Sequence, residues 1–115
     1  MLPNADKERL LHIRDASRKI AEFTAGLSEE EFRNSDLVQH GVMNCLYIIG
    51  EAASRVDSTT RERLPDIEWD VMRGMRNRLA HAYFDINLDI IWYSATVDTP
   101  RLLEVVETIL ASETE

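Results

Sequence analysis

The sequence contains few of the residues that cross-link or interrupt a chain. It has one cysteine, Cys45, so no disulfide can form within the chain, and a cytoplasmic location is expected because cytosolic proteins keep their thiols reduced. Cys45 lies in the most apolar stretch, where packing is its expected role. Three prolines, four glycines and a hydrophobic content of 44% exclude the disordered and fibrous classes. We therefore expect a compact globular protein.

The sequence also lacks a long apolar segment. A membrane-spanning helix needs roughly 20 consecutive apolar residues, and the longest candidate, Gly41 to Ala53, is interrupted by Asn44, Gly50 and Glu51. The N-terminal residues do not place a basic segment before an apolar one, so we expect neither a secretory signal nor membrane insertion. A length of 115 residues suits one domain, 1–115.

Positive charge is in the minority. The chain has 13 basic and 21 acidic residues and a net charge of -8, which repels a polyanion on average and argues against a protein that coats nucleic acid. Between Trp69 and Tyr83, however, three arginines face a single aspartate. This local positive excess leaves room for a small anion site.

Hydrophobic periodicity predicts an all-helical chain. Apolar residues recur at helical spacing, and no segment shows the sustained two-residue alternation of a strand. Gly26 is a stop signal, Ser28 and Glu31 form a capping box, and Pro100 is expected to restart a final helix after a break at residues 98–100. The fold is predicted to be an up-and-down helical bundle of four to six helices. The expected helices are Asp6–Ala25, a short helix from Ser28, Asp36–Val56, one turn from Ser58, Asp66 or Glu68 to His81, Asn87–Val97 with Asn87 as its cap, and the final helix.

The helix expected over Asp36–Val56 differs from the others in being apolar nearly all round. That pattern is typical of a helix at the centre of a bundle. Gly41, Cys45 and Ala52 fall on one side of it, together with Ile48. These small residues are expected to let a neighbouring helix come close.

The segment from Arg76 to Tyr83 holds the residues best suited to chemistry. Imidazole exchanges a proton near neutral pH and guanidinium stabilises charge on phosphoryl oxygens, so His81 and Arg76 suit phosphodiester cleavage without a metal. The spacing alone is weak, because about 0.3 occurrences of Arg followed five positions later by His are expected by chance. Arg33 and His40 form a decoy at a looser spacing. Unlike His40, His81 is predicted to end a helix, with Tyr83 soon after it.

A longer pattern around these residues resembles a known family. The run Met72–Phe84 contains an arginine, a polar residue, three more positions, a histidine, one residue and a tyrosine. Tyr47–Ala53 lies upstream, and Ile90–Trp92 followed by Thr99–Leu102 lies downstream. In order and interval these segments resemble the HepT family of HEPN proteins, and the resemblance covers most of the chain. It implies an all-α, dimeric HEPN domain.

The resemblance implies roles for matching residues. Arg76 and His81 match the family's catalytic pair, and Asn77 matches the polar residue after the arginine. Arg73 and Arg78 are additional positive residues in supporting positions, and the resemblance does not fix their roles. The implied activity is metal-independent endonucleolytic cleavage of RNA through attack by the ribose 2′-hydroxyl, which leaves a cyclic phosphate. No cofactor is implied.

The resemblance also implies a partner. Tyr83 matches the tyrosine that a nucleotidyltransferase modifies with AMP in HepT systems. The chain would then be the toxin of a type VII toxin–antitoxin system, neutralised by a minimal nucleotidyltransferase antitoxin.

Helix geometry adds a constraint on the expected site. Arg76 and His81 are five residues apart and so about 140° apart around an ideal helix, which means that one helix cannot aim both at one phosphate. Either the helix ends before His81, or a second subunit completes the site. Gly74, Asn77 and His81 share a stripe opposite the apolar face that begins at Val71. A glycine on that stripe allows close approach of a partner helix and favours a homodimer.

Each residue also has a simpler interpretation. Arg76 and Arg78 suit the C-terminal end of a helix, where His81 can act as a cap. Tyr83 can be a packing aromatic. Glu51, in an apolar helix, is interpreted as a hydrogen-bond or ion-pair partner for an arginine rather than a catalytic base. A metal site is not expected, since no His or Cys pair has ligand spacing.

Two functions therefore remain open at the level of sequence. The first is a ribonuclease toxin with a nucleotidyltransferase antitoxin. The second is a non-catalytic helical interaction module that binds a nucleotidyltransferase or a nucleotide and uses its arginines as an anion clamp.

Overall fold

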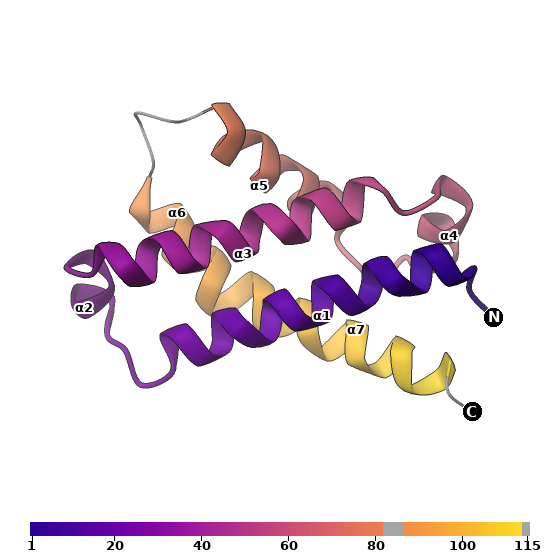
Figure 1. The fold of residues 1–115 in the computed structure, drawn as a ribbon, viewed down its shortest axis with the longest axis horizontal. Coiled ribbons are helices and arrows are strands. Elements are labelled where there is room, and N and C mark those ends of the chain that lie inside the picture. Colours follow the sequence, from indigo (N-terminus) through magenta and orange to yellow (C-terminus); the bar gives the residue numbers. More distant parts are fainter. Residues whose placement is uncertain (82–86, 114–115) are drawn as a thin grey trace.

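The computed structural model describes residues 1–81 and 87–113. The side chains of Met75, Asn77, Arg78, Ala80 and His81 lie outside that description. Every regular element in the described residues is helical, and six helical segments result when the continuous last three elements are counted together, so the predicted all-α fold of four to six helices is confirmed (Figure 1). The elements are α1 (Asn4–Thr24), α2 (Glu29–Arg33), α3 (Asp36–Ser54), α4 (Ser58–Arg63), α5 (Trp69–His81), α6 (Leu88–Tyr93), η1 (Ser94–Asp98) and α7 (Thr99–Glu113).

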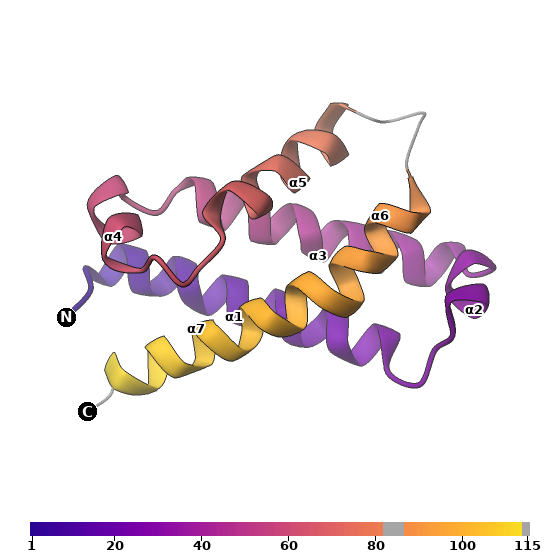
Figure 2. The same ribbon diagram turned by 180° about the vertical axis from the view of Figure 1, so that it is seen from behind.

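The long helices run alternately in opposite directions. α1 and α3 lie side by side and antiparallel, α5 returns along α3, and the path through α6, η1 and α7 runs back so that both ends of the chain lie at the same end of the molecule (Figures 1 and 2). α3 packs on both α1 and α5, and α7 packs on α1. The predicted central position of α3 is therefore correct.

Local signals start and stop these helices where the sequence predicts. The Ser28 hydroxyl accepts from the Glu31 N–H at 3.1 Å and the Glu31 carboxylate accepts from the Ser28 N–H at 3.0 Å, which completes the capping box. The Asn87 side chain accepts from the N–H of Asp89 at 2.9 Å. Gly26, after α1, has a φ of 70°, a backbone conformation that glycine adopts without a Cβ penalty.

The core lies where α1, α3 and α7 meet. Its fully buried members are Leu10, Ile13, Ile20, Phe32, Val42, Leu46 and Val106. Burial of each such side chain contributes about 1.5–3 kcal/mol before the loss of conformational entropy is counted. The small-residue side of α3 packs against α1 of the same chain, where the Phe23 ring approaches Gly41. The neighbouring helix that those small residues admit is therefore α1.

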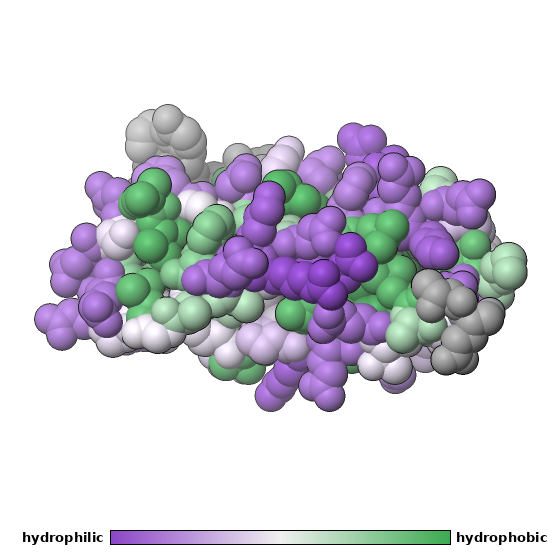
Figure 3. Space-filling model, turned by 60° about the horizontal axis from the view of Figure 1, so that its bottom comes forward, coloured by the Kyte–Doolittle hydropathy of each residue, from purple (hydrophilic) through white to green (hydrophobic). Residues whose placement is uncertain are grey.

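The face that α1 and α7 present is largely hydrophilic, with hydrophobic patches between the charged side chains (Figure 3). Arg18 of α1 pairs with Glu107 of α7 across this face at 2.6 Å. A second polar link joins α1 to α4, because the buried Asp6 carboxylate accepts from the Asp57 N–H at 3.1 Å and from the Thr60 hydroxyl. These contacts hold α1 against α7 and α4.

The predicted break at residues 98–100 is wrong. The helix continues because η1 is a π-helical turn in which the Thr99 N–H donates to the Ser94 oxygen, five residues back. In a turn of this width the Ala95 carbonyl faces the nitrogen of Pro100, which carries no hydrogen. The Thr99 hydroxyl donates to that oxygen instead, at 2.9 Å. A side chain thus replaces the missing backbone donor and lets the helix pass the proline.

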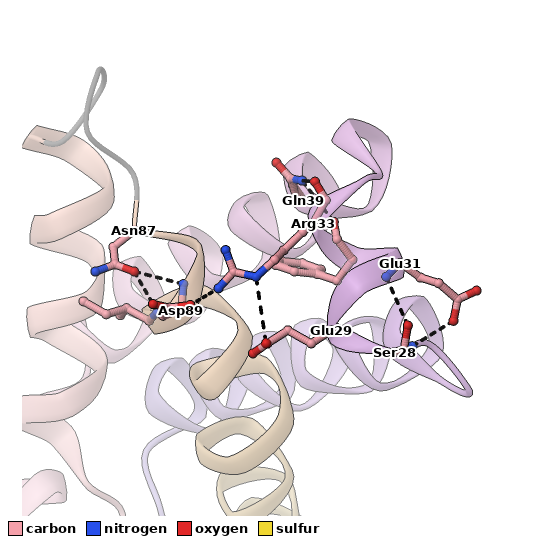
Figure 4. Close-up of polar contacts among 9 residues, drawn as sticks. Ser28, Glu29, Glu31, Arg33, Gln39, Asn87 and Asp89 are labelled. Carbon is pink, nitrogen blue, oxygen red and sulfur yellow. Dashed lines mark hydrogen bonds and ion pairs between the residues drawn. The ribbon is translucent and has the colours of Figure 1, made fainter.

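A polar cluster fastens α2 to the start of α6 (Figure 4). Arg33 pairs with Asp89 and lies 3.9 Å from a Glu29 oxygen. The Gln39 amide donates to the carbonyl oxygens of Phe32 and Arg33 at 3.0 Å each. The start of α6 is therefore held against α2.

Candidate active site

α5 meets α3 at close range where α3 has a glycine. A Cβ atom at Gly50 would lie 2.3 Å from the Arg76 Cβ and 3.0 Å from the Met72 carbonyl oxygen. Contacts this short do not occur, so any larger residue at this position would push α5 away. Gly50 therefore sets the distance between Arg76 and α3.

Arg76 reaches along α3 to two polar side chains. Its Nη1 donates to the Glu51 Oε1 at 3.1 Å and to the Ser54 hydroxyl at 3.0 Å. The Arg76 and Glu51 side chains are 29% and 31% exposed, so the pair is partly screened from water but open to a ligand. Glu51 is thus an ion-pair partner of an arginine, as its place in an apolar helix indicates.

Glu51 also faces a second cation. Its Oε2 lies 3.6 Å from Nη2 of Arg55, one turn further along α3. Two guanidinium groups therefore share one carboxylate, and the cluster keeps a charge of about +1 in a protein of net charge -8. A positive group held in a partly dry, hydrogen-bonded setting is suited to bind a phosphate oxygen.

The close α3–α5 contact also decides which side of α5 is buried. The sequence predicts that Val71, Met72, Met75 and Leu79 share the apolar face of this helix. Met72 is 4% exposed and Leu79 packs against the core, as predicted, but the assignment of Val71 to this face is wrong, because Val71 is 40% exposed. The approach at Gly50 turns positions 72 and 76 toward α3. Val71 instead lines a cleft between α5 and α6.

The other predicted site residues divide into two groups. Arg73 forms an ion pair with Asp70 of its own helix, α5. α5 extends through His81, so the helix does not end before that residue. Positions 76 and 81 therefore lie about 140° apart around the helix axis. The side chains of Asn77, Arg78 and His81, and all of Tyr83, lie outside the described residues.

The sequence was compared with known proteins. It matches the family described as ribonuclease HepT-like over residues 13–109, a span that includes Gly50, Glu51 and the whole of α5. The chain belongs to the HepT-like ribonuclease family. No solved structure matches it.

Curated relatives of this HepT-like chain are similar along nearly their whole length. The protein named "Putative RNase MJ1380" from Methanocaldococcus jannaschii is 33% identical over 90% of this chain and 94% of its own. "Probable ribonuclease HepT" from Thermococcus cleftensis is 33% identical over 88% of this chain and 92% of its own. "Putative RNase TTE0752" from Caldanaerobacter subterraneus is 33% identical over 90% of this chain and 93% of its own.

Two residues of the HepT-like site were not singled out by sequence pattern. Ser54 and Arg55 follow Glu51 by three and four residues, the spacing that places side chains on one helix face. Ser54 accepts from Arg76 and donates to the Glu51 carbonyl oxygen at 2.8 Å. The i, i+3 and i+4 spacing around an acidic residue in an apolar helix is the signal that predicts both contacts.

Two further features of the HepT-like chain concern metal ligands and the length of its apolar helices. Across residues 1–81 and 87–113, no group of three or more His, Cys, Asp or Glu side chains is arranged to hold a metal ion. None of the described helices is long and apolar enough to cross a membrane.

Proposed function

We propose that this chain is a metal-independent endoribonuclease that acts as the toxin of a type VII HEPN toxin–antitoxin system in the cytoplasm. The proposal assigns phosphate binding to Arg76 and proton transfer to His81. Membership of a ribonuclease family supports the reaction class. The observation that carries the residue assignment is the fixed, partly exposed Arg76 guanidinium on the helix that ends at His81.

The proposed reaction is an internal displacement at phosphorus. A neutral imidazole takes the proton of the ribose 2′-hydroxyl, the 2′-oxygen forms a bond to phosphorus, and the bond from phosphorus to the 5′-oxygen breaks. An imidazolium returns a proton to the departing 5′-oxygen. Arg76 stabilises the charge that develops on the other phosphoryl oxygens. The products are a 2′,3′-cyclic phosphate and a 5′-hydroxyl end.

The proposed site includes two copies of the chain. Positions 76 and 81 point in directions about 140° apart on one unbroken helix. A two-fold axis beside α5 would bring His81 of one subunit toward Arg76 of the other, and it would also supply a second imidazole. One histidine can then act as the base while the other acts as the acid.

The proposed control of the toxin is AMP transfer to Tyr83 by a minimal nucleotidyltransferase antitoxin. An adenylate adduct carries a phosphate and an adenosine. Placed beside the arginines of α5, it would compete with RNA by charge and by volume.

The catalytic assignment is tested with matched histidine variants. His81→Ala should reduce cleavage of an RNA substrate by roughly 10²–10⁴-fold, the usual contribution of general acid–base catalysis. His40→Ala is the control, because His40 is exposed and bonds the Asp36 carbonyl oxygen of its own helix at 2.7 Å. Full activity of His81→Ala would contradict the mechanism.

The role of the arginine is tested by two substitutions in the same assay. Arg76→Ala should cause a loss of similar order, and Arg76→Lys should restore part of it, because a point charge cannot reproduce a planar guanidinium. Circular dichroism and thermal unfolding show whether each variant is folded. A chelator such as EDTA should leave wild-type activity unchanged, and its loss would contradict metal independence.

Tyr83→Phe tests neutralisation separately from cleavage. The variant should cleave RNA nearly as well as wild type but should resist silencing by the nucleotidyltransferase and ATP, since the hydroxyl that accepts AMP is missing. Mass spectrometry should find the adenylate on wild type only. Equal silencing of both proteins would contradict the assignment of Tyr83.

A non-catalytic interaction module is the second candidate. It is favoured by the fact that Arg76 is already engaged by Glu51 and Ser54, as a purely structural arginine would be. Persistent binding of a nucleotidyltransferase by a protein that cleaves no RNA would support this candidate.

A further inference from the structure

A groove runs between α1 and α3. It consists of two adjoining hollows of about 280 and 220 Å³, which share His12 and Ile48. In Figure 1 the two helices lie side by side along this groove. Small residues form its floor, among them Ala16, Cys45 and Ala52. The groove therefore follows the length of two helices and has the form of a channel for an extended chain.

The described cations are of two kinds, those that form an ion pair with a carboxylate and those that form none. Arg14, Arg18, Arg33 and Arg73 lie in ion pairs with carboxylates. Among residues 1–81 and 87–113, Arg9 and Lys19 form no ion pair, and neither do Lys7, Arg61, Arg63 and Arg101 outside the groove. Arg9 and Lys19 line the α1 side of the groove together with His12.

The carboxylates of the groove are already engaged. Asp15 accepts from Arg14 outside the groove at 3.0 Å, and Glu51 is shared by Arg55 and Arg76. The groove is thus locally positive in a protein whose net charge is -8. Such a surface attracts a polyanion that the rest of the molecule repels.

Exposed rings and an aliphatic side chain border the same groove. Phe23, Tyr47 and Ile48 are 41%, 43% and 38% exposed. Unpaired bases stack on exposed aromatic rings, whereas the bases of a duplex are already stacked on one another. Aromatic rings among cations therefore fit single-stranded RNA better than a double helix.

One residue belongs both to the groove and to the candidate active site. Glu51 lines the groove, and the same carboxylate contacts Arg76 of α5. In contrast, the hollow among α3, α5 and α7 is bordered by Asp66, Glu68 and Asp98, whose charges oppose RNA.

We infer that the α1–α3 groove binds the single-stranded RNA that flanks the scissile phosphate. Arg9, Lys19 and Arg55 contact its phosphates, and Tyr47 stacks on a base. The inference rests on the proposed ribonuclease function and adds the path by which the substrate reaches Arg76. A second copy of this chain is the competing occupant of the groove, because exposed apolar side chains also suit a dimer contact.

Binding is measured apart from cleavage. In a His81→Ala background, fluorescence anisotropy with a labelled single-stranded RNA of 12 nucleotides should show that Arg9→Glu with Lys19→Glu weakens binding by about 10-fold or more and makes its salt dependence shallower. The control is Arg61→Glu with Arg101→Glu, which makes the same change in net charge outside the groove. Tyr47→Ala should weaken binding about 5- to 100-fold.

The outcomes separate the groove from the nuclease. If the groove variant and the charge-matched control bind RNA with equal affinity, the proposal that the groove binds RNA is overturned. If the groove variant loses a dimer in light scattering but keeps its RNA affinity, the groove is a contact with a second copy, and the RNA-binding proposal is overturned. In the cleaving protein the groove variant should raise KM more than it lowers kcat. If no cleavage is found but RNA binding depends on Arg9 and Lys19, the groove stands and the ribonuclease proposal fails.

Discussion

Glu51 is the residue on which the polar cluster of the site depends. Its carboxylate lies between Arg55 and Arg76, at 3.6 and 3.1 Å. Partly exposed ion pairs contribute little to stability, on the order of 1 kcal/mol or less. We therefore ascribe its importance to the orientation of Arg76.

The substitution Glu51→Gln keeps the shape of the side chain and removes its charge. Unfolding free energy should fall by about 1 kcal/mol or less, whereas kcat should fall more clearly because Arg76 loses its charged anchor. KM should not rise, since a negative charge near the RNA is removed. Glu104→Gln, an exposed change on α7, is the control. A rise in KM with unchanged kcat would show that Glu51 does not position Arg76.

Asp98 allows a prediction about pH. Burial raises the pKa of its carboxyl above the ordinary value of 3.8, the charge of Glu68 raises it further, and the Ser94 hydrogen bond and Arg101 act in the opposite direction. Between 3.8 and the raised value, the folded protein holds more protons than the unfolded chain, so stability falls as pH rises through that window.

The consequence can be measured with Asp98→Asn. The stability of the variant relative to wild type should increase as pH rises from about 4 toward 7, because wild type must then carry a partly buried charge that the variant lacks. Denaturant unfolding at several pH values tests this. Asp66→Asn, an exposed carboxylate on the rim of the same hollow, should change stability little. A difference that grows on acidification would contradict the assignment.

At the scale of elements, the α3–α5 contact provides a matched pair of glycine variants. A Cβ at Gly50 would overlap α5, so Gly50→Ala should destabilise by about 1–3 kcal/mol and lower activity by displacing Arg76. Nothing lies within 4 Å of a Cβ at Gly74, so Gly74→Ala should stabilise α5 by up to about 1 kcal/mol. Thermal unfolding of both variants is the measurement, and equal effects would contradict the close contact.

Most helix starts could be predicted because their signals are local. Ser28 with Glu31 and Asn87 make cap hydrogen bonds to residues two or three positions away, and such contacts need no tertiary structure. The continuous helix through Pro100 could not be predicted, because it depends on a hydroxyl that replaces a backbone donor. The burial of α5 also required tertiary information, since a single glycine on α3 determines which side of α5 faces inward.

The geometry of the candidate site could likewise be predicted from the sequence only in part. The ion pair of Glu51 could be predicted, because a charge in an apolar helix needs a partner. That the partner is Arg76 depends on how α5 lies on α3. The positions of the His81 and Tyr83 side chains lie outside the described residues, so their joint geometry with Arg76 stays a prediction.

At the scale of the whole molecule, we predict a two-fold dimer with the two His81 residues near the axis. The α5–α6 cleft, of about 440 Å³, offers a contact surface, with Gly74 in open space and Val71, Ile90 and Tyr93 exposed. Light scattering should detect the dimer. Ile90→Glu should shift it toward monomer, and Leu37→Glu, at a site 85% exposed on α3, should not. A stable monomer with full activity would contradict the composite site.

The π-helical turn in the last helix has a consequence for how the bundle closes. A turn of this kind holds one more residue than an α-turn, and one residue corresponds to a rotation of about 100° around the axis. The apolar stripe after η1 is therefore rotated, relative to the stripe before it, from the direction that a continuous α-helix would give it. Ile91 is buried on one side of the turn, and Leu102, Val106 and Leu110 are buried on the other. If the same residues were wound as a regular α-helix, that second stripe would rotate by about 100° away from α1, so the wide turn at η1 keeps Leu102, Val106 and Leu110 in the core.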